Sequence, residues 1–147
     1  MDDWLVLGLL AAVAYSVSGL ASKVALDKKY LNLDATTAAI LTMVGVVLAF
    51  ALFYILFAGM KVPQLKPTAA LVGVAIGFFW ALGAILVYYG LIKGADIARM
   101  APVYNLNTLI IVFSAILLLG ELPEKSAAIR VVLGAILIIA GGILVSI

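Results

Sequence analysis

The sequence predicts an all-α integral membrane protein with five transmembrane helices. The first observation is composition, since 67% of the 147 residues are hydrophobic and only 11% are charged. The mean hydropathy of +1.34 is well above that of a soluble domain with a solvated surface. The second observation is that the hydrophobic residues form five runs, each near the ~20 residues that a helix needs to cross a bilayer. These runs cover about residues 4–26, 35–59, 69–92, 97–119 and 127–147.

Short loops join these runs, so we expect residues 1–147 to form a single transmembrane domain without a soluble part. The first run differs from a secretory signal, because Asp2 and Asp3 stand where a basic region is expected and its core is longer. We therefore expect it to remain in the mature protein. Each run follows residues that can cap a helix through a side-chain oxygen, namely Asp2 or Asp3, Asp34, Thr68, Asp96 and Ser126.

The residue types that are missing exclude several kinds of chemistry. The chain has no cysteine and no histidine, which excludes disulfides, a thiolate nucleophile, histidine acid–base catalysis and the usual zinc or haem ligand sets. No pair of acids and no nucleophile with a base lies at one membrane depth, so we expect no enzyme activity, metal or cofactor. The formal net charge of +2 indicates no nucleic-acid partner.

Aromatic and polar residues lie in the middle of two predicted spans. Projection of the first span at 100° per residue places Tyr15 and Ser18 on a face of small residues, with Tyr15 at the midpoint. In the third span Trp80 is at the midpoint and shares a glycine-lined face with Tyr88. Such faces serve helix packing or line a cavity; tyrosine and tryptophan away from the interfacial belts favour a cavity wall. The stripe around Thr42 in the second span is interpreted as helix packing.

The fourth span has the most polar residues, in the stretch 101–121 (APVYNLNTLIIVFSAILLLGE). Pro102 predicts either a kink or a separate first turn over 97–101. Polar side chains in a span usually face protein, water or substrate, so this helix is interpreted as a pathway wall; the alternative is that its amides and hydroxyls only tie helices together. The candidate substrate-binding residues are Tyr15, Ser18, Trp80, Tyr88, Tyr104, Asn107 and Thr108.

Two further features concern the last spans. Glu121 ends the fourth span, where its charge opposes the helix dipole, and Lys125 or Arg130 is the expected partner in a structural hairpin. Gly134 and Gly141 lie seven residues apart on one face of the last span and predict a packing or dimerisation seam.

The run 94–121 (GADIARMAPVYNLNTLIIVFSAILLLGE) and the later GAILIIAGG resemble an EamA-type domain of the drug/metabolite transporter (DMT) superfamily. The chain is similar in particular to the short five-helix bacterial and archaeal members. The resemblance implies a central cavity between two such domains, lined largely by the first, third and fourth helices of each. Related short proteins can carry charged residues after the proline, whereas Tyr104 and Asn105 stand here, so a relative's substrate charge is not transferred.

An odd number of spans means that a second unit, joined directly, is inverted relative to the first, so the five helices are expected to form one half of an inverted-repeat transporter. The basic residues divide almost evenly, with Lys61, Lys66, Lys125 and Arg130 on one side of the membrane and Lys23, Lys28, Lys29, Lys93 and Arg99 on the other. We therefore predict insertion in both orientations and an antiparallel homodimer in the lipid bilayer. A parallel dimer and a heterodimer with a sister chain are the alternatives.

These observations predict a multi-pass secondary transporter in the plasma membrane of a prokaryote. It is expected to move small metabolites or drug-like molecules by alternating access around a central midplane cavity. No carboxylate lies at a span midpoint, which favours neutral or zwitterionic substrates without proton coupling through a buried acid. The alternatives are a small dual-topology channel and a non-transporting accessory membrane subunit.

Overall fold

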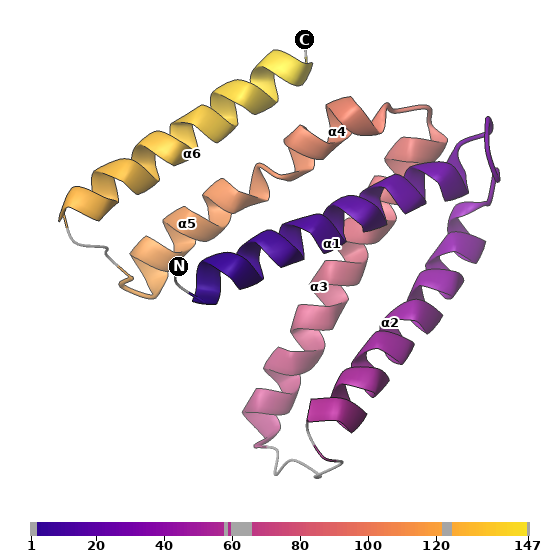
Figure 1. The fold of residues 1–147 in the computed structure, drawn as a ribbon, viewed down its shortest axis with the longest axis horizontal. Helices are drawn as coiled ribbons and strands as arrows, with labels where there is room; N and C mark the ends of the chain where they lie inside the picture. The colour runs from indigo at the N-terminus through magenta and orange to yellow at the C-terminus, as the bar shows by residue number, and fades with distance from the viewer. Residues whose placement is uncertain (1–2, 58, 60–65, 122–124, 147) are drawn as a thin grey trace. The chain divides into compact units, whose positions relative to one another are not determined.

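The computed structural model describes residues 3–57, 59, 66–121 and 125–146. All regular elements of these residues are helices, and no strand occurs among them (Figure 1). The helices are α1 (Asp3–Leu26), α2 (Ala35–Phe57), α3 (Pro67–Ile92), α4 (Ile97–Tyr104), α5 (Asn107–Leu118) and α6 (Lys125–Ser146).

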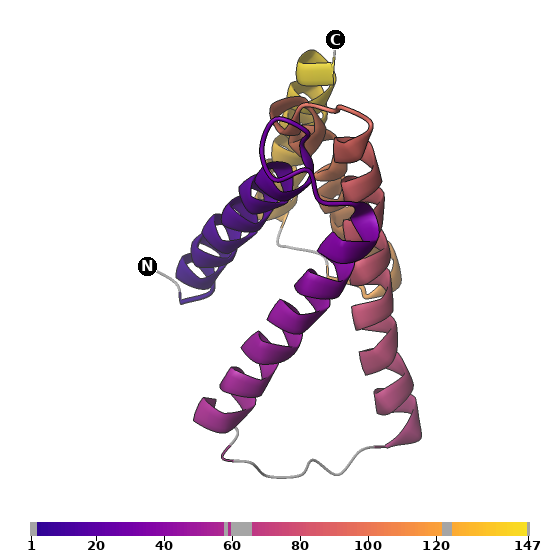
Figure 2. The same ribbon diagram turned by 90° about the vertical axis from the view of Figure 1, so that its right-hand side faces the viewer.

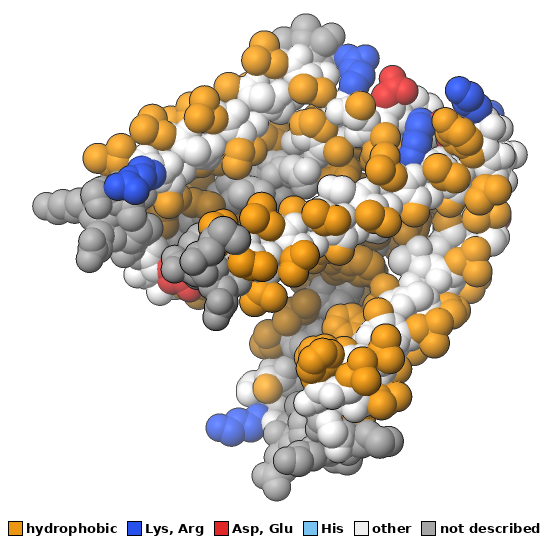
Figure 3. Space-filling view, viewed as in Figure 1, with side chains coloured by type: hydrophobic (Ala, Val, Ile, Leu, Met, Phe, Trp, Pro, Cys, Tyr) orange, Lys and Arg blue, Asp and Glu red, His pale blue; other side chains and the backbone are white. Residues whose placement is uncertain are grey.

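The predicted all-α membrane fold is confirmed. Four helical segments are long and apolar enough to cross a membrane, and α6 contains a shorter apolar helix, Ile129–Val145. The four segments are Leu5–Leu26, Ala35–Phe57, Pro67–Ile92 and Ile97–Leu118. In the space-filling view hydrophobic side chains cover the visible sides of α2 and α6, while charged side chains gather near helix ends (Figure 3).

The chain divides into two compact units, Met1–Gly94 with α1 to α3 and Ala95–Ile147 with α4 to α6. In the first unit the three helices pack at the end that carries loop 27–34. The buried residues of this unit are Leu26, Ala38, Tyr88 and Leu91, all within about three turns of that loop or of the adjoining end of α3. Figure 2 shows that α2 and α3 are close at this end and separate toward their other ends.

Loop 27–34 is held by its two aspartates. Asp27 forms an ion pair of 2.7 Å with Lys23 and accepts a hydrogen bond from the backbone amide of Lys29. The Lys23 ammonium and the Lys29 amide hold the pKa of Asp27 below its ordinary value, because both favour the carboxylate. Asn32 has a φ of 50°, the left-handed conformation that asparagine tolerates better than most residues. The loop thus turns sharply and delivers the chain to α2.

The predicted helix cap is confirmed at Asp34 and is wrong at Thr68 and Ser126. Asp34 caps α2, since it accepts hydrogen bonds from the amide and the hydroxyl of Thr37. Thr68 is not a cap: α3 begins at Pro67, where a missing amide hydrogen costs nothing. Ser126 is not a cap either, because α6 already begins at Lys125.

The other two predicted caps lie at the starts of α4 and α1. Asp96 occupies the N-cap position of α4, but its side chain makes no capping hydrogen bond. The helix α1 begins at Asp3, while Asp2 lies outside the described residues.

In the second unit, α6 packs against both α4 and α5. Its buried positions are small, Ala135 and Gly142, which lets the helices approach closely. The guanidinium of Arg99 in α4 donates a hydrogen bond of 3.4 Å to the carbonyl oxygen of Val145. A cation thus lies near the carboxyl end of α6, where the helix dipole favours it.

Candidate functional site

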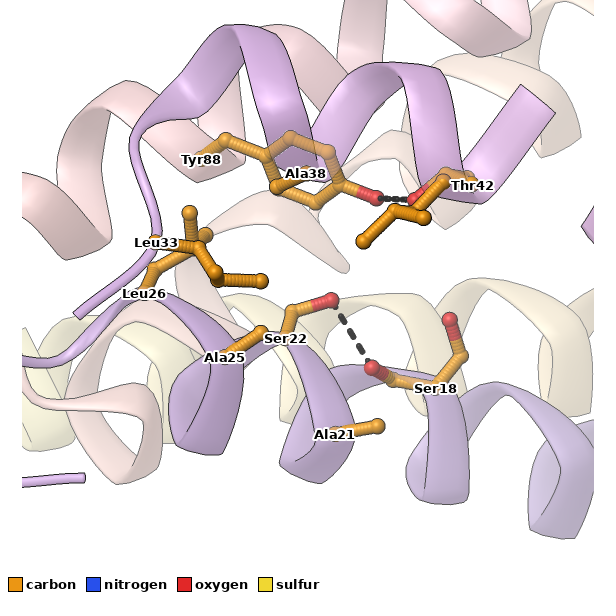
Figure 4. Close-up of a pocket in the computed structure, with 10 residues that line it drawn as sticks. Ser18, Ala21, Ser22, Ala25, Leu26, Leu33, Ala38, Thr42 and Tyr88 are labelled. Atoms are coloured by element: carbon orange, nitrogen blue, oxygen red, sulfur yellow. Dashed lines mark hydrogen bonds between the residues drawn. The ribbon is translucent and has the colours of Figure 1, made fainter. Parts of the chain in front are cut away.

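A cavity of about 260 Å³ lies between α1, α2 and α3 of the first unit (Figure 4). It occupies the part of the unit that lies nearest to loop 27–34. The wall combines hydroxyl-bearing, alanine and leucine side chains, namely Ser18, Ala21, Ser22, Ala25, Leu26, Leu33, Ala38, Leu41, Thr42 and Tyr88.

A hydrogen bond between two hydroxyls closes one side of this cavity. The Thr42 Oγ1 and the Tyr88 hydroxyl oxygen are 2.7 Å apart and join α2 to α3. Tyr88 is only 7% exposed. The small Ala38 side chain, one turn before Thr42, leaves space for the tyrosine ring beside α2 (Figure 4). A buried tyrosine hydroxyl needs a partner, and the threonine supplies it.

The serines of α1 form the opposite wall. The Ser22 hydroxyl donates to the carbonyl oxygen of Ser18 at 2.8 Å, a common use of serine inside a helix. The Ser18 hydroxyl points toward the side of the cavity that carries Thr42 (Figure 4). It makes no hydrogen bond within the part of the chain that the structure describes.

The cavity brings together two of the residues predicted from the sequence, Ser18 and Tyr88, and adds Ser22 and Thr42. The sequence pattern predicts a helix-packing role for Thr42, and its bond to Tyr88 does tie two helices together. The pattern did not indicate that Thr42 also lines a cavity. Its depth in the membrane could have indicated this, because Thr42 and Tyr88 both lie within about 11 Å of the ends of their helices near the same loop.

Tyr15 and Trp80 lie outside this cavity. They are about 16–18 Å along α1 and α3 from the ends near loop 27–34, close to the middle of a bilayer core of about 30 Å. Tyr15 is 66% exposed and Trp80 46% exposed. The two midpoint aromatic residues therefore remain available to a partner or a ligand.

A second cavity, of about 470 Å³, lies against loop 27–34. It is lined by Leu26, Lys28, Asn32, Leu33, Asp34, Ala35, Thr36, Tyr89 and Ile92. Leu26 and Leu33 line both cavities, so the hydroxyl-lined cavity and the cavity with charged residues at the loop adjoin at these two leucines.

The fourth span is interrupted at Asn105 and Leu106, between α4 and α5. The predicted separate turn over 97–101 is wrong, because α4 continues through Pro102 to Tyr104, while the predicted kink at Pro102 stays a prediction. Pro102 has no amide hydrogen for the carbonyl of Ala98. After it the helix tightens: the Leu106 amide donates to Val103, three residues earlier, at 3.2 Å.

The three candidate residues of the fourth span lie at this interruption. Tyr104 ends α4, Asn107 begins α5 and Thr108 follows it. All three are exposed. The Thr108 hydroxyl is 3.5 Å from the amide oxygen of Asn107, and its backbone amide donates to the carbonyl of Asn105. An aromatic ring, two amide side chains and a hydroxyl thus gather where the backbone leaves α-helical geometry.

The end of α5 depends on Gly120. Its φ of 68° is the left-handed conformation that favours glycine. The amide of Glu121 donates to the carbonyl of Ala115, six residues earlier, which is a typical glycine-dependent helix stop. The described residues contain no ion pair between Glu121 and Arg130, and the side chain of Lys125, the other expected partner, lies outside them.

The described residues contain no group of three acidic, histidine or cysteine side chains that could hold a metal ion. The arrangement instead offers hydroxyls, amides and aromatic rings. Such groups are able to form hydrogen bonds and ring contacts with a polar, uncharged molecule.

Comparison with known proteins identifies the family. The EamA-like transporter family matches residues 3–147, nearly the whole chain. Neither the curated proteins nor the solved structures gave a match. The match covers the interrupted fourth span and the glycine-containing α6, on which the resemblance to this family was based. The chain is thus a multi-pass membrane protein that belongs to the EamA-like transporter family of the DMT superfamily, whose members are transporters and not enzymes.

Proposed function

We propose that this protein is a secondary transporter of small neutral or zwitterionic molecules. It works by alternating access as an antiparallel homodimer in the plasma membrane of a prokaryote. The observation that carries the proposal is the interruption of the fourth span at Asn105 and Leu106, flanked by Tyr104, Asn107 and Thr108. Membership in the EamA-like transporter family agrees with it.

The interruption supports a binding role because its tightened turn shifts the hydrogen bonds of the backbone: the Leu106 amide donates to Val103 and leaves the Pro102 carbonyl oxygen without its α-helical donor. Carbonyl groups released in this way at membrane depth are tolerated where protein surrounds them or where they line a water-filled cavity. Transporters use such discontinuous helices to present backbone and polar side chains to a substrate. The break lies about 12–14 Å along the span from Ile97, which is near the bilayer midplane.

A second copy of the chain supplies the other half of the transporter. Five spans and an even distribution of basic residues favour opposite orientations of the two copies. The exposure of Tyr15 and Trp80 at mid-depth agrees with an assembly in which they face a cavity. The cavity is proposed to be lined by Tyr15, Trp80, Tyr104, Asn107 and Thr108 from both copies.

The substrate class follows from the charges. None of these five residues is an aspartate, glutamate, lysine or arginine, so a net-charged substrate would lose its hydration without a compensating charge. Zwitterions and neutral polar molecules can instead use hydroxyl, amide and aromatic partners. No span midpoint carries an acid that would couple transport to protons.

Labelling of single cysteines tests the orientation. Lys28 and Lys66 are exposed and lie at opposite ends of the α2–α3 hairpin. The native chain has no cysteine, so Lys28→Cys and Lys66→Cys can be labelled in intact cells with an impermeant maleimide without background. We expect each variant to label in about half of its molecules. Complete labelling of one and none of the other rules out the antiparallel homodimer.

Flux measurements in liposomes test the transport activity. The purified chain is first screened by thermal shift with neutral amino acids, sugars and polyols, and a stabilising compound is then used for counterflow. We expect saturable flux that unlabelled compound inside the liposomes accelerates, and a loss of flux in Trp80→Ala and Asn107→Ala. Large passive ion currents would identify a channel, and unaltered activity in cells carrying both alanine variants would favour an accessory subunit.

Proton coupling is tested in the same liposomes. We expect an uncoupler to leave the flux unchanged. If the flux collapses both with the uncoupler and in Glu121→Gln, an acid at the end of α5 drives transport and the uncoupled mechanism is wrong.

A further inference from the structure

We propose that the cavity between α1, α2 and α3 is a binding site for a small uncharged molecule that carries an amide or hydroxyl group and a short apolar part. Its place in a transport cycle rests on the proposed function, since the bound molecule would be the transported substrate or a close analogue. The binding itself needs only the first unit. The cavity is closer to loop 27–34 than the midpoint residues Tyr15 and Trp80 are.

The hydroxyls of the wall have unused hydrogen-bonding capacity. Thr42 and Tyr88 together hold two hydroxyl hydrogens, and their mutual bond of 2.7 Å uses one of them. The Ser22 hydroxyl donates to the Ser18 carbonyl and keeps its oxygen lone pairs. The Ser18 hydroxyl faces the cavity (Figure 4) and has no hydrogen bond to the described residues. The two opposing walls can therefore both donate to and accept from one ligand.

The cavity wall selects against charge. No lysine, arginine, aspartate or glutamate lines it. A carboxylate or ammonium group that enters the cavity loses its hydration and finds no opposite charge there. The free-energy cost of this loss is far larger than the gain from hydrogen bonds to the hydroxyls. A neutral amide or alcohol exchanges its hydrogen bonds to water for bonds to the wall at little net cost.

Size and lining define the rest of the ligand. The volume of about 260 Å³ is below the usual range of pockets for drug-sized molecules, roughly 300–1,000 Å³. Leu26, Leu33 and Leu41 provide an apolar surface beside the hydroxyls. A molecule with a few carbons and one or two polar groups matches this combination.

The second, larger cavity adjoins the proposed site at the loop and shares Leu26 and Leu33 with it. Leu26 is only 2% exposed, whereas Leu33 belongs to the loop and is half-buried. The proposed route for a solute therefore leads from the aqueous side past the Leu33 side chain.

Saturation-transfer NMR on the full chain in nanodiscs tests the site, with propionamide and 1,2-propanediol as neutral probes. Propionate is the charged control, because it has nearly the same shape as propionamide. Each probe is measured with the wild type and with Ser18→Ala, Thr42→Val, Tyr88→Phe and Ser16→Ala. Ser16 is the matched control, since its hydroxyl donates to the Ala12 carbonyl on the same helix and does not line the cavity.

We expect saturation transfer to at least one neutral probe and not to propionate. Loss of one hydroxyl should weaken binding about three- to tenfold, whereas Ser16→Ala should leave it unchanged. The proposal is overturned if no neutral probe binds, if propionate binds equally well, or if the three cavity variants bind like the wild type. Ser18→Ala keeps the test valid if Tyr88→Phe does not fold, because it removes no observed side-chain hydrogen bond.

The outcomes separate this proposal from the proposed function. Binding that depends on the cavity hydroxyls, in a chain that shows no flux in liposomes, supports the site and contradicts the transporter. Flux that persists in Thr42→Val and Tyr88→Phe, together with unchanged probe binding, overturns the site and leaves the transporter intact.

Discussion

Gly142 of α6 lies directly against Leu106, at the interruption of the fourth span. A Cβ atom at residue 142 would be 3.2 Å from Leu106 Cδ2 and 3.6 Å from the carbonyl oxygen of Pro102. The Leu106 amide donates to Val103 and not to this Pro102 oxygen. The missing side chain of a glycine therefore lets α6 cover the position where the backbone of the fourth span departs from an α-helix.

Gly142→Val should destabilise the second unit. Added atoms must displace Leu106 or separate α6 from α4, and overpacking of this kind costs about 1–3 kcal/mol. Gly83→Val is the control, because Gly83 also lies inside a helix, a Cβ there meets nothing within 4 Å and the helix-propensity change is the same. Thermal unfolding of both purified variants in one detergent measures the difference. Equal midpoints would show that Gly142 has no special packing role.

Pro102→Ala should make the fourth span more continuous. Alanine supplies the amide hydrogen that can donate to the Ala98 carbonyl and removes the clash of the proline ring with that turn. We expect hydrogen exchange of the amides at residues 105–108 to slow at least tenfold, and substrate flux to fall. Pro67→Ala is the control, since Pro67 is at the first position of α3, where its missing amide hydrogen has no consequence. If the amide hydrogen exchange of residues 105–108 is unchanged in Pro102→Ala, the polar residues at the interruption cause the break and not the proline.

The Thr42–Tyr88 bond should contribute measurably to the stability of the first unit. We expect a double-mutant cycle with Thr42→Val and Tyr88→Phe to give a coupling energy of about 0.6 kcal/mol, the average for hydrogen bonds between membrane helices. The measurement is unfolding of the single and double variants in mixed micelles. Additive effects of the two substitutions would show that the 2.7 Å contact does not stabilise the fold.

Asp34 should make the start of α2 sensitive to acid. The Thr37 hydroxyl and amide donate to its carboxylate and hold its pKa below the ordinary value of 3.8. The pKa is lower in the folded state than in the unfolded one, so the stabilisation is complete above about pH 4 and is lost as pH falls through the lowered pKa. Unfolding of the wild type and Asp34→Ala between pH 2 and 7 tests this.

We expect Asp34→Ala to be less stable at neutral pH and to approach the wild type at the acid end. Asp96→Ala is the control, because Asp96 holds the same helix position without a capping hydrogen bond. The prediction fails if both variants respond to pH alike.

Local sequence signals were sufficient for the type of fold and for several details of the site. Hydrophobic runs of membrane length predicted the helices, since a span must satisfy its own backbone hydrogen bonds within itself. Pro102 predicted that the fourth span departs from a regular α-helix, and the structure places the break three residues later, at Asn105 and Leu106. The hydrogen bonding of the chain after Pro102, which no residue pattern specifies, decided that α4 ends at Tyr104.

The sequence by itself determined that the chain is an all-α membrane protein without cysteine, histidine or a mid-span acid, because these properties depend on composition and run length alone. Only the tertiary structure decided that Thr42 reaches Tyr88 and that Gly142 reaches Leu106. These pairs are 46 and 36 residues apart in the chain, and their contact depends on the rotation and crossing of whole helices. Membrane helices are nearly uniform in hydrophobicity around their circumference, so the sequence pattern fixes that rotation only weakly, and close packing of small residues determines it.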